Sequence, residues 1–600
     1  MASRVQANYF TDLRIRRHFT NATTNVTPPF KKVLIANRGE IAIRIAKAAA
    51  GLNIPSVSVS SEQDSKALHS RVTSENVEIG QSISDPVQKY LSIEAIINAA
   101  KKHNCDCIHP GYGFLSENDE FVKRCEDNNI KFIGPTSTTI ALFGSKVEAR
   151  KLAINANVPV VPGSTTIFAT GQDVQHFVAN NNIGMTYPVM LKASNGGGGR
   201  GMRIVDNADD IIPAFESCQK EALNAFGNGD MFVEQYVQRP RHIEIQILAD
   251  SKGNTIHLFE RDCSVQLRNQ KVMEIAPAPN LSKQTRENMY ADAIKLVKAA
   301  KYENAGTVEF LYSPEKNEYY FIECNPRIQV EHTVTEQVTG IDLVETQFLI
   351  AAGKSLETLG LMNSNIQANG FAIQARVVAT GEGTIQGYNQ PSGIGIRVDG
   401  CGYLGLKPPP FYDPLFAKLV VFNNNNNKTF DQVVAKLKAA LEEFHVSGLP
   451  TNLESLIKIT DNSVFQNGEA RTTFLTEFPD IMSNQSSSSK NSILTLLDEQ
   501  SSKFSDGGIN DEDNANAKLI AFNDKTPDDF AVVMEISGNV IKYHVAVGDG
   551  VKEGDRLISV VSMKMETVIR SPKEGVIVAL QEDFKEGVNI NPGDEIAIIR

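Results

Sequence analysis

The sequence contains the stretch Pro188-Val189-Met190-Leu191-Lys192-Ala193-Ser194-Asn195-Gly196-Gly197-Gly198-Gly199-Arg200-Gly201-Met202-Arg203, in which an apolar strand pattern runs directly into four consecutive glycines. Because glycine lacks a Cβ atom, the backbone amides of such a run can close around phosphate oxygens. No Gly-Lys-Ser/Thr follows, so this is not a Walker loop. A flexible linker is the alternative, but the position immediately after a strand that ends in Lys192 favours a loop that covers nucleotide phosphates.

Carboxylates suited to a metal ion follow further along the chain. A hairpin of two neighbouring strands is predicted at Gly306-Thr307-Val308-Glu309-Phe310-Leu311 and Phe321-Ile322-Glu323-Cys324-Asn325. Since alternate side chains of a strand point to the same face, Glu309, Glu323 and Asn325 can face the same way. Their oxygens are hard ligands of the kind that Mg²⁺ takes when it is bound to nucleotide phosphates.

The second of these strands leads at once into Asn325-Pro326-Arg327-Ile328-Gln329-Val330-Glu331-His332. This segment places a cation, an amide and a carboxylate beside the predicted metal ligands. Such a group could hold and deprotonate a small oxyacid. Each of these residues alone is typical of a solvated surface, so the prediction depends on their grouping.

The beginning of the chain has a different character. Its first 30 residues are basic and rich in hydroxyl and amide side chains, with four arginines against a single acid: Arg4, Arg14, Arg16, Arg17 and Asp12. This pattern is typical of a mitochondrial presequence, and a cytosolic extension is the alternative. An apolar strand at 33–36 then leads through Asn37-Arg38-Gly39-Glu40 into a helix beginning near Ile41, which predicts an α/β domain.

The end of the chain contains an internal repeat. The segment Gly548-Asp549-Gly550-Val551-Lys552-Glu553-Gly554-Asp555-Arg556-Leu557 returns as Gly587-Val588-Asn589-Ile590-Asn591-Pro592-Gly593-Asp594-Glu595-Ile596. Each copy alternates apolar and turn residues, so two similar four-stranded halves are predicted to pack face to face as a small flattened barrel. Lys564, in Val561-Ser562-Met563-Lys564-Met565-Glu566-Thr567, falls between the copies on a predicted hairpin tip, where a modifying enzyme could reach it.

The composition argues against several classes of protein. The chain of 600 residues is 41% hydrophobic, which is ordinary for buried cores and leaves room for several domains. Its 59 basic and 71 acidic residues give a net charge of -12, which argues against bulk binding to nucleic acid or to an anionic membrane. No apolar run approaches the roughly 18 residues of a transmembrane helix. The seven cysteines lack metal-ligand spacing, so we expect reduced thiols.

Together these motifs resemble those of the biotin-dependent carboxylases. Residues from about 30 to 480 are similar to a biotin carboxylase through four distinctive segments: Ala36-Asn37-Arg38-Gly39-Glu40, His109-Pro110-Gly111-Tyr112-Gly113-Phe114-Leu115-Ser116-Glu117-Asn118, Glu260-Arg261-Asp262-Cys263-Ser264 and Arg327-Ile328-Gln329-Val330-Glu331. Met563-Lys564-Met565 resembles the attachment site of covalent biotin in carboxyl-carrier domains. A lipoyl domain shares that fold, but its lysine typically follows an acidic residue.

The resemblance implies an α/β and α+β biotin carboxylase fold followed by an all-β flattened barrel of the biotinyl or lipoyl type. The expected parts are a mitochondrial presequence (1–30), a Rossmann-like N-terminal domain (31–145), an ATP-grasp domain (146–345), a C-terminal carboxylase domain (346–480), a flexible linker (481–527) and a biotinyl domain (528–600). A linker of that length would let the carrier visit two distant sites.

The resemblance also implies roles for individual residues. Glu331 would deprotonate bicarbonate, Arg397 would stabilise the developing ureido oxyanion, and Lys564 would carry the biotin. Bicarbonate would be held by four residues, of which the first two also count as catalytic: Lys271, Arg327, Gln329 and Val330. The metal ligands would be Glu309, Glu323 and Asn325. ATP would be bound by Lys146, Lys192, Gly196, Gly197, Gly198, Gly199, Glu234, Tyr236, Val237, His242, Gln266 and Asn269.

By this resemblance the chain uses ATP, Mg²⁺ or Mn²⁺ and bicarbonate to make carboxybiotin on its own carrier. The sequence ends at Arg600, just after the carrier, so we expect a separate carboxyltransferase subunit and, by family frequency, an acyl-CoA as acceptor. Pyruvate, another 2-oxoacid and urea remain open as acceptors, as does a biotinylated scaffold without turnover. Asn269, where many relatives have histidine, and Phe411-Tyr412-Asp413-Pro414 are similar to features of urea carboxylases.

Further partners are implied by the same resemblance. A biotin protein ligase is expected to modify Lys564, and the chain is expected to join a homo-oligomer or hetero-oligomer. The expected location is the mitochondrial matrix, or otherwise the cytoplasm, with no nucleic-acid or membrane partner.

Overall fold

The computed structural model describes residues 27–181, 183–194, 201–362, 366–423, 429–482, 530–534, 538–562, 565–580, 589–590 and 594–600. Most of the predicted presequence and linker, the glycine run 196–199 and Lys564 lie outside these residues. Among the helices that the structure describes, none combines the length and the apolar character needed to cross a bilayer.

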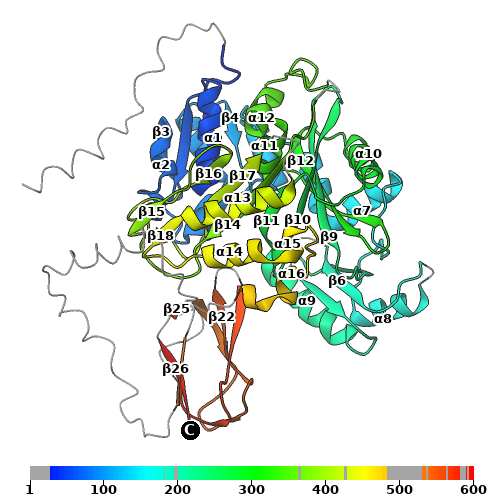
Figure 1. Ribbon diagram of the computed structural model, residues 1–600, viewed down its shortest axis with the longest axis vertical. Helices are drawn as coiled ribbons and strands as arrows, with labels where there is room; N and C mark the ends of the chain where they lie inside the picture. The colour runs from blue at the N-terminus through cyan, green and yellow to red at the C-terminus, as the bar shows by residue number, and fades with distance from the viewer. Residues whose placement is uncertain are drawn as a thin grey trace, which may run out of the picture.

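Five short strands form an all-parallel sheet in the order β3-β2-β1-β4-β5. Figure 1 shows this part of the chain in blue, with β3 and β4 labelled. They are β1 (Val33–Ile35), β2 (Ser56–Ser60), β3 (Glu75–Glu78), β4 (Cys107–His109) and β5 (Lys131–Phe132). The helical segments of this part are α1 (Gly39–Gly51), η1 (Glu62–Asp64), α2 (His69–Val72), α3 (Pro86–Leu91), α4 (Ile93–Lys102), α5 (Asp119–Asp127) and α6 (Ser137–Gly144). Every side chain of β1 is buried, as expected for the central strand of a parallel sheet. The predicted Rossmann-like arrangement is confirmed.

A separate small sheet, ordered β7-β6-β8, contains the strand predicted before the glycine run. Its strands are β6 (Val189–Ala193), β7 (Met202–Val205) and β8 (Met231–Gln235), all paired antiparallel. The accompanying helices are α7 (Lys146–Asn155), α8 (Gly171–Asn180) and α9 (Ile211–Phe226). Helix α9 packs on β6 and α8, while α7 packs on the larger sheet described next.

The largest sheet has eight strands in the order β13-β12-β9-β10-β11-β14-β17-β16. They are β9 (Arg241–Ala249), β10 (Thr255–Leu267), β11 (Gln270–Ala276), β12 (Asn304–Ser313), β13 (Glu318–Asn325), β14 (Phe371–Val378), β16 (Ile396–Gly400) and β17 (Leu415–Asn423). All of its pairs are antiparallel, and β11 pairs with β14. Residues on the two sides of the expected boundary at 345 therefore share one continuous sheet.

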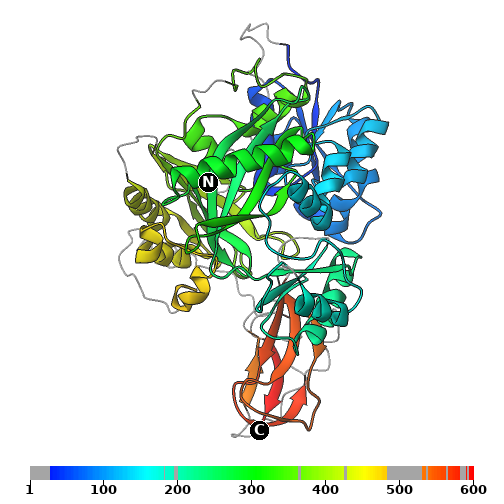
Figure 2. The ribbon, with the colours of Figure 1, turned by 90° about the vertical axis from the view of Figure 1, so that its right-hand side faces the viewer.

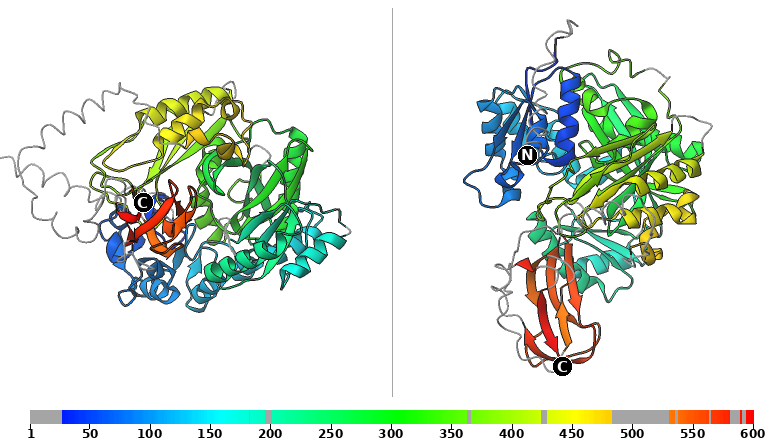
Figure 3. Two further views of the ribbon diagram at one scale, coloured as in Figure 1. Left: turned by 90° about the horizontal axis from the view of Figure 1, so that it is seen from below. Right: turned by 60° about the vertical axis from the view of Figure 1, so that its left-hand side comes forward.

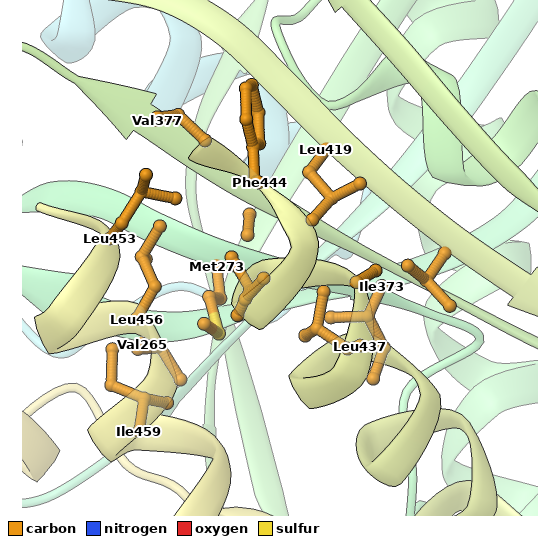
Figure 4. Packing of buried hydrophobic residues seen from close by; sticks show 14 of the residues in the cluster. Val265, Met273, Ile373, Val377, Leu419, Leu437, Phe444, Leu453, Leu456 and Ile459 are labelled. Atoms are coloured by element: carbon orange, nitrogen blue, oxygen red, sulfur yellow. The ribbon is translucent and has the colours of Figure 1, made fainter. Parts of the chain in front are cut away.

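Helices and short strands complete this part of the chain. The helices are α10 (Lys283–Ala299), α11 (His332–Thr339), α12 (Leu343–Ala351), α13 (Phe430–Glu443), α14 (Leu453–Asp461), α15 (Ser463–Gln466), α16 (Phe474–Glu477) and the short turn η2 (Pro479–Ile481). A further two-stranded pair is formed by β15 (Gly387–Asn389) and β18 (His445–Ser447). Figure 4 shows apolar side chains of the large sheet, such as Met273 and Leu419, packed with Leu437 of α13 and Leu456 of α14.

A β-bulge places Lys271 and Glu274 of β11 on the same face of the sheet. Val265 pairs with Met273 and the next residue, Gln266, pairs with Lys271, so one residue of β11 is extra. Because directly paired residues share a face, Met273 and Lys271 point to opposite sides although they are two positions apart. Lys271 therefore shares the polar face with Glu274.

The C-terminal part forms two four-stranded sheets, ordered β19-β26-β24-β21 and β23-β22-β20-β25. Their strands are β19 (Phe530–Val533), β20 (Gly538–Tyr543), β21 (Gly550–Val551), β22 (Arg556–Ser562), β23 (Met565–Arg570), β24 (Gly575–Leu580), β25 (Asn589–Ile590) and β26 (Glu595–Ile599). Leu557, Ile577 and Ile599 lie in one buried core, so the two sheets pack as predicted from the repeat. Figures 2 and 3 show this barrel projecting from the rest of the molecule.

The predicted attachment hairpin is present on both sides of Lys564. Strands β22 and β23 pair antiparallel up to Ser562 and Met565. Lys564 itself lies outside the described residues.

Candidate active site

A cavity of about 1520 Å³ opens between the small sheet, the polar face of the large sheet and the loops that follow β14 and precede β17. It brings together the predicted binding residues that come from distant segments. Those in its wall are Lys146, Lys192, Glu234, Tyr236, Val237, His242, Gln266, Asn269, Lys271, Glu309, Glu323, Asn325, Arg327, Gln329 and Val330. Two predicted catalytic residues, Glu331 and Arg397, are not in the wall.

The predicted metal ligands lie side by side because β12 and β13 pair in register. Glu309 pairs with Glu323, and Thr307 pairs with Asn325, so the three predicted side chains share one face. The amide of Asn325 donates to Glu309 Oε1 over 2.7 Å, and His242 Nε2 lies 2.7 Å from Glu309 Oε2. Two carboxylates and an amide at the cavity wall fit the oxygen ligands that Mg²⁺ prefers.

The two predicted phosphate-binding lysines also reach this wall. Lys146 Nζ lies 2.7 Å from Glu323 Oε2, and Lys192 Nζ lies 2.6 Å from Glu234 Oε2. Burial opposes the charge of Lys146, but the neighbouring carboxylates, Glu323 first, raise its pKa above the ordinary value. Lys146 is therefore an ammonium group that can hold anionic phosphate oxygens, and Lys192 lines the same wall.

Lys271 is the centre of the predicted bicarbonate pocket. Its Nζ lies 2.6 Å from Glu244, 2.7 Å from Glu331 and 3.2 Å from Glu309. Burial alone would lower the pKa of Lys271, but the carboxylates, Glu244 foremost, raise it well above the ordinary value. A cation in this position faces the cavity and can bind a small oxyanion.

Arg327 lies on the loop between β13 and α11 and, like Lys271, lines the cavity. Its guanidinium donates to Gln329 Oε1 over 2.9 Å, and its Nε lies 3.3 Å from Glu117 Oε2. Gln329 in turn donates to Glu309 Oε1 over 3.0 Å. These contacts fix the predicted bicarbonate-binding residues relative to the metal ligands.

Glu331 is fully buried just behind the wall, at the residue that precedes α11. Its Oε1 lies 2.7 Å from Lys271 Nζ, and its Oε2 accepts from Arg376 Nη2 over 3.1 Å. Burial would raise the pKa of Glu331, but the positive charges of Lys271, Arg376 and Arg261 hold it well below the ordinary value. An anion bound to these cations would offset their charge and raise the proton affinity of Glu331.

Arg376 on β14 is a functional residue that sequence reasoning missed. It lines the cavity, contacts Glu331 and pairs with Glu274 through its Nε over 2.5 Å. The signal was the alternation of Gln374 and Arg376 with apolar residues along β14, which indicates a strand with one polar face.

Arg397, which the sequence suggested for the oxyanion role, lies elsewhere. It is on β16, with Asp399 accepting two of its hydrogen bonds over 2.9 and 2.6 Å and Glu336 accepting one over 2.8 Å. The structure does not bring Arg397 into the wall that Lys271 and Arg327 line. The physical reason is that β16 is the edge strand, two strands away from β14.

Asn269 has a local structural explanation. Arg268 and Asn269 form the two-residue turn between β10 and β11, and their φ values are +50° and +63°. Two positive φ values define a type I′ turn, in which asparagine is favoured. Asn269 lines the cavity from this turn.

Family models match the chain in the order predicted from the sequence. They are "Biotin carboxylase, N-terminal domain" over 29–140, "Carbamoyl-phosphate synthase L chain, ATP binding domain" over 145–359, "Biotin carboxylase C-terminal domain" over 374–477 and "Biotin-requiring enzyme" over 527–599. The solved biotin carboxylase domain of Hydrogenobacter thermophilus 2-oxoglutarate carboxylase, in complex with MgADP, ADP and bicarbonate, is 41% identical with a TM-score of 0.72. That match covers 76% of this chain and 99% of the other. The chain belongs to the biotin-dependent carboxylase family. The predicted fold class, the ligase class and the use of biotin and ATP are confirmed for this carboxylase.

Pyruvate carboxylases are also similar to this carboxylase. The Pichia angusta enzyme is 44% identical over 490 residues, which cover 80% of this chain and 41% of that one. The human mitochondrial enzyme is 44% identical over 462 residues, 76% of this chain and 38% of that one. The solved Rhizobium etli pyruvate carboxylase with acetyl coenzyme A is 42% identical with a TM-score of 0.72, over 78% of this chain and 42% of that one. The chain thus spans 38 to 41% of the length of these two curated relatives.

Proposed function

We propose that this chain carboxylates biotin on its own carrier domain, using ATP and bicarbonate. The observation that carries the proposal is the position of Glu331, held between Lys271 and Arg376 directly behind the cavity that contains Glu309 and Glu323. A base, cations for an oxyanion and carboxylates for a divalent ion thereby surround one space. The fit of Glu309, Glu323 and Asn325 to an oxygen-ligated ion, and the MgADP in the Hydrogenobacter structure, support Mg²⁺ in this role.

In the proposed reaction Lys271 and Arg327 hold bicarbonate, and Glu331 removes its proton. The resulting anion attacks the terminal phosphorus of ATP, whose oxygens Lys146 and Lys192 hold, and ADP leaves. The product, carboxyphosphate, releases phosphate as its carboxyl group is transferred. Biotin, when bound, would supply the nitrogen that accepts this group, and the released phosphate would accept the proton of that nitrogen. We assign to Arg376 the stabilisation of negative charge beside Glu331, in place of Arg397, because Arg376 lines the cavity.

The position of the carrier domain supports delivery of its biotin to this space. Thr567 of β23, three residues after Lys564, is part of the cavity wall. A biotin protein ligase would be needed to load Lys564, as expected from the sequence.

For the final acceptor we propose pyruvate, with another 2-oxoacid as the second candidate. The two curated relatives described above are pyruvate carboxylases, and the Hydrogenobacter structure comes from a 2-oxoglutarate carboxylase. The acyl-CoA acceptor expected from family frequency finds no support in these similarities. We propose that a carboxyltransferase active site, on a separate subunit or on further protein chain, takes the carboxyl group. A mitochondrial location is supported by relatives such as the human and mouse enzymes.

The test is bicarbonate-dependent ATP hydrolysis by the full-length biotinylated chain and by a Glu331→Gln variant. Because a positioned general base typically contributes about 10² to 10⁴ in rate, we expect the variant to lose that much turnover while its ATP affinity stays unchanged. Glu318→Gln, an exposed carboxylate of β13, is the matched control. Absence of bicarbonate-dependent hydrolysis in the wild type would favour the scaffold interpretation, and full activity of Glu331→Gln would remove Glu331 from its role.

The acceptor is identified by purifying the chain through its biotin, with Lys564→Arg as the control. Copurifying carboxyltransferase activity is then assayed with pyruvate, 2-oxoglutarate, urea and acetyl-CoA. Carboxylation of pyruvate supports the proposal, and carboxylation of acetyl-CoA alone contradicts it.

A further inference from the structure

Glu274 on β11 is a fully buried carboxylate outside the cavity wall. Its two oxygens accept hydrogen bonds from different partners on β14. Arg376 Nε donates to Oε1 over 2.5 Å, and Gln374 Nε2 donates to Oε2 over 2.8 Å. Both partners lie on the strand paired with β11, where Glu274 is directly opposite Gln374.

Gln374 extends the contact to the helix that follows Glu331. Thr333, in the first turn of α11, donates to Gln374 Oε1 over 2.5 Å. Glu274 is therefore connected to Glu331 along two routes, through the guanidinium of Arg376 and through Gln374 and Thr333. The first route consists of the hydrogen bonds of the half-buried Arg376. The second consists of the buried hydrogen bonds of Gln374 and reaches Thr333, two residues after Glu331 in the chain.

We propose that Glu274 is a positioning residue that fixes the guanidinium of Arg376 toward Glu331 and the cavity. Arginine binds carboxylates through a planar fork, so a carboxylate on Nε determines the direction in which the remaining nitrogens point. With Nε engaged by Glu274, the Nη2 atom meets Glu331 Oε2 at 3.1 Å. This inference concerns the proposed reaction and rests on the role assigned to Arg376.

The charges around Glu274 make its role depend on pH. Those that face it are Arg376 of β14, Lys271 of β11, Glu331 beside α11 and the Cys263 thiol of β10. Burial raises the pKa of Glu274 to about 6, although Arg376 opposes this increase and Glu331 adds to it. Protonation would remove the charge that holds Arg376, so turnover should decline as the pH falls through about 6.

The experiment measures kcat, the KM for ATP and the KM for bicarbonate of Glu274→Gln across the pH range 5 to 8. Because a displacement of about 1 Å at a catalytic group can cost 10²-fold, we expect kcat to fall about 100-fold, the KM for ATP to stay within about twofold, and the acidic decline near pH 6 to disappear. Glu274→Asp keeps a carboxylate on a side chain one methylene shorter, and should recover part of kcat together with the acidic decline.

The outcomes separate this inference from the proposed function. Wild-type kcat in Glu274→Gln, or an acidic decline that is unchanged in it, would overturn the inference while the proposed function stands. A wild-type enzyme without bicarbonate-dependent hydrolysis would instead overturn the proposed function. If Glu274→Gln does not fold, the wild-type pH profile still decides, because a kcat that is constant between pH 5 and 7 contradicts the inference.

Discussion

Arg376 and Arg397 occupy two regions of the same polar sheet face and are held in similar ways, yet only one faces the cavity. Each guanidinium is bound by two carboxylates, Glu274 and Glu331 for Arg376, and Asp399 and Glu336 for Arg397. Arg376 lies on β14 next to Lys271, whereas Arg397 lies on the edge strand β16.

The register accounts for this difference. On β17, Lys418 is opposite both Arg376 and Asp399, and Val420 is opposite Arg397. Adjacent strands are about 4.8 Å apart, so Arg397 is displaced by about 10 Å across the sheet and by one pleat repeat along it. A charged residue on this sheet face can act in the reaction only where the register brings it to the cavity.

The region around Arg397 connects separate parts of the chain and does not line the cavity. Glu336 on α11 accepts from Arg397 over 2.8 Å and from Arg44 on α1 over 2.7 Å. It thereby joins the N-terminal α/β part to the large sheet. We infer that the Arg397 region contributes mainly to stability and the Arg376 region mainly to turnover.

Alanine variants of the two arginines should differ strongly in turnover. Arg376→Ala should lower kcat for bicarbonate-dependent ATP hydrolysis by about 10² to 10³, because removal of one charge-stabilising donor typically has that effect. Arg397→Ala should lower it less than tenfold. Arg376→Lys keeps the charge without the planar fork and should lie between wild type and Arg376→Ala. Equal losses of kcat in Arg376→Ala and Arg397→Ala would show that the two regions are not distinct.

Much of the site could be predicted from the sequence because it depends on local periodicity. Glu309, Glu323 and Asn325 share a face through the alternation of a short hairpin, and this prediction agrees with the observed register. The repeat likewise predicted two four-stranded sheets in the C-terminal barrel.

The remaining contacts depend on long-range pairing, which local patterns do not encode. Arg376 meets Glu274 across 102 residues, and the bulge in β11 that turns Lys271 toward Glu331 becomes visible only in the pairing with β10. For the same reason the sequence could not distinguish Arg376 from Arg397. Both follow an apolar residue in a short strand pattern.

Loss of the Arg397 side chain should lower stability more than turnover. Arg397→Ala leaves the buried carboxylates of Glu336 and Asp399 without this partner, and loss of one member of a buried ion pair typically costs about 3 to 5 kcal/mol. We expect the free energy of unfolding, measured with urea, to fall by about that amount. Lys438→Ala, which removes an ion pair with Asp461 on the surface, should change it by less than about 1 kcal/mol. A small change for Arg397→Ala would contradict the structural role.

Asp399 and Glu274 should contribute to the pH dependence of stability with opposite signs. For Asp399, burial would raise the pKa, but the hydrogen bonds and charge of Arg397 hold it below the ordinary 3.8. The folded state then binds this proton less readily than the unfolded state, so its contribution to stability is present above about pH 4 and is lost as the pH falls. For Glu274 the folded pKa of about 6 lies above the ordinary 4.5, so stability should decrease as the pH rises from 4.5 through 6.

Urea unfolding of Asp399→Asn and Glu274→Gln between pH 3 and 7 separates these two contributions. Asp399→Asn should flatten the loss of stability below pH 4 and leave the interval from 4.5 to 6 unchanged, since only the carboxyl with the lowered pKa is removed. Glu274→Gln should flatten the interval from 4.5 to 6 and leave the acidic loss unchanged. If both variants change the pH dependence of stability over the same pH interval, the two regions titrate as one network. The division between a turnover region and a stability region is then wrong.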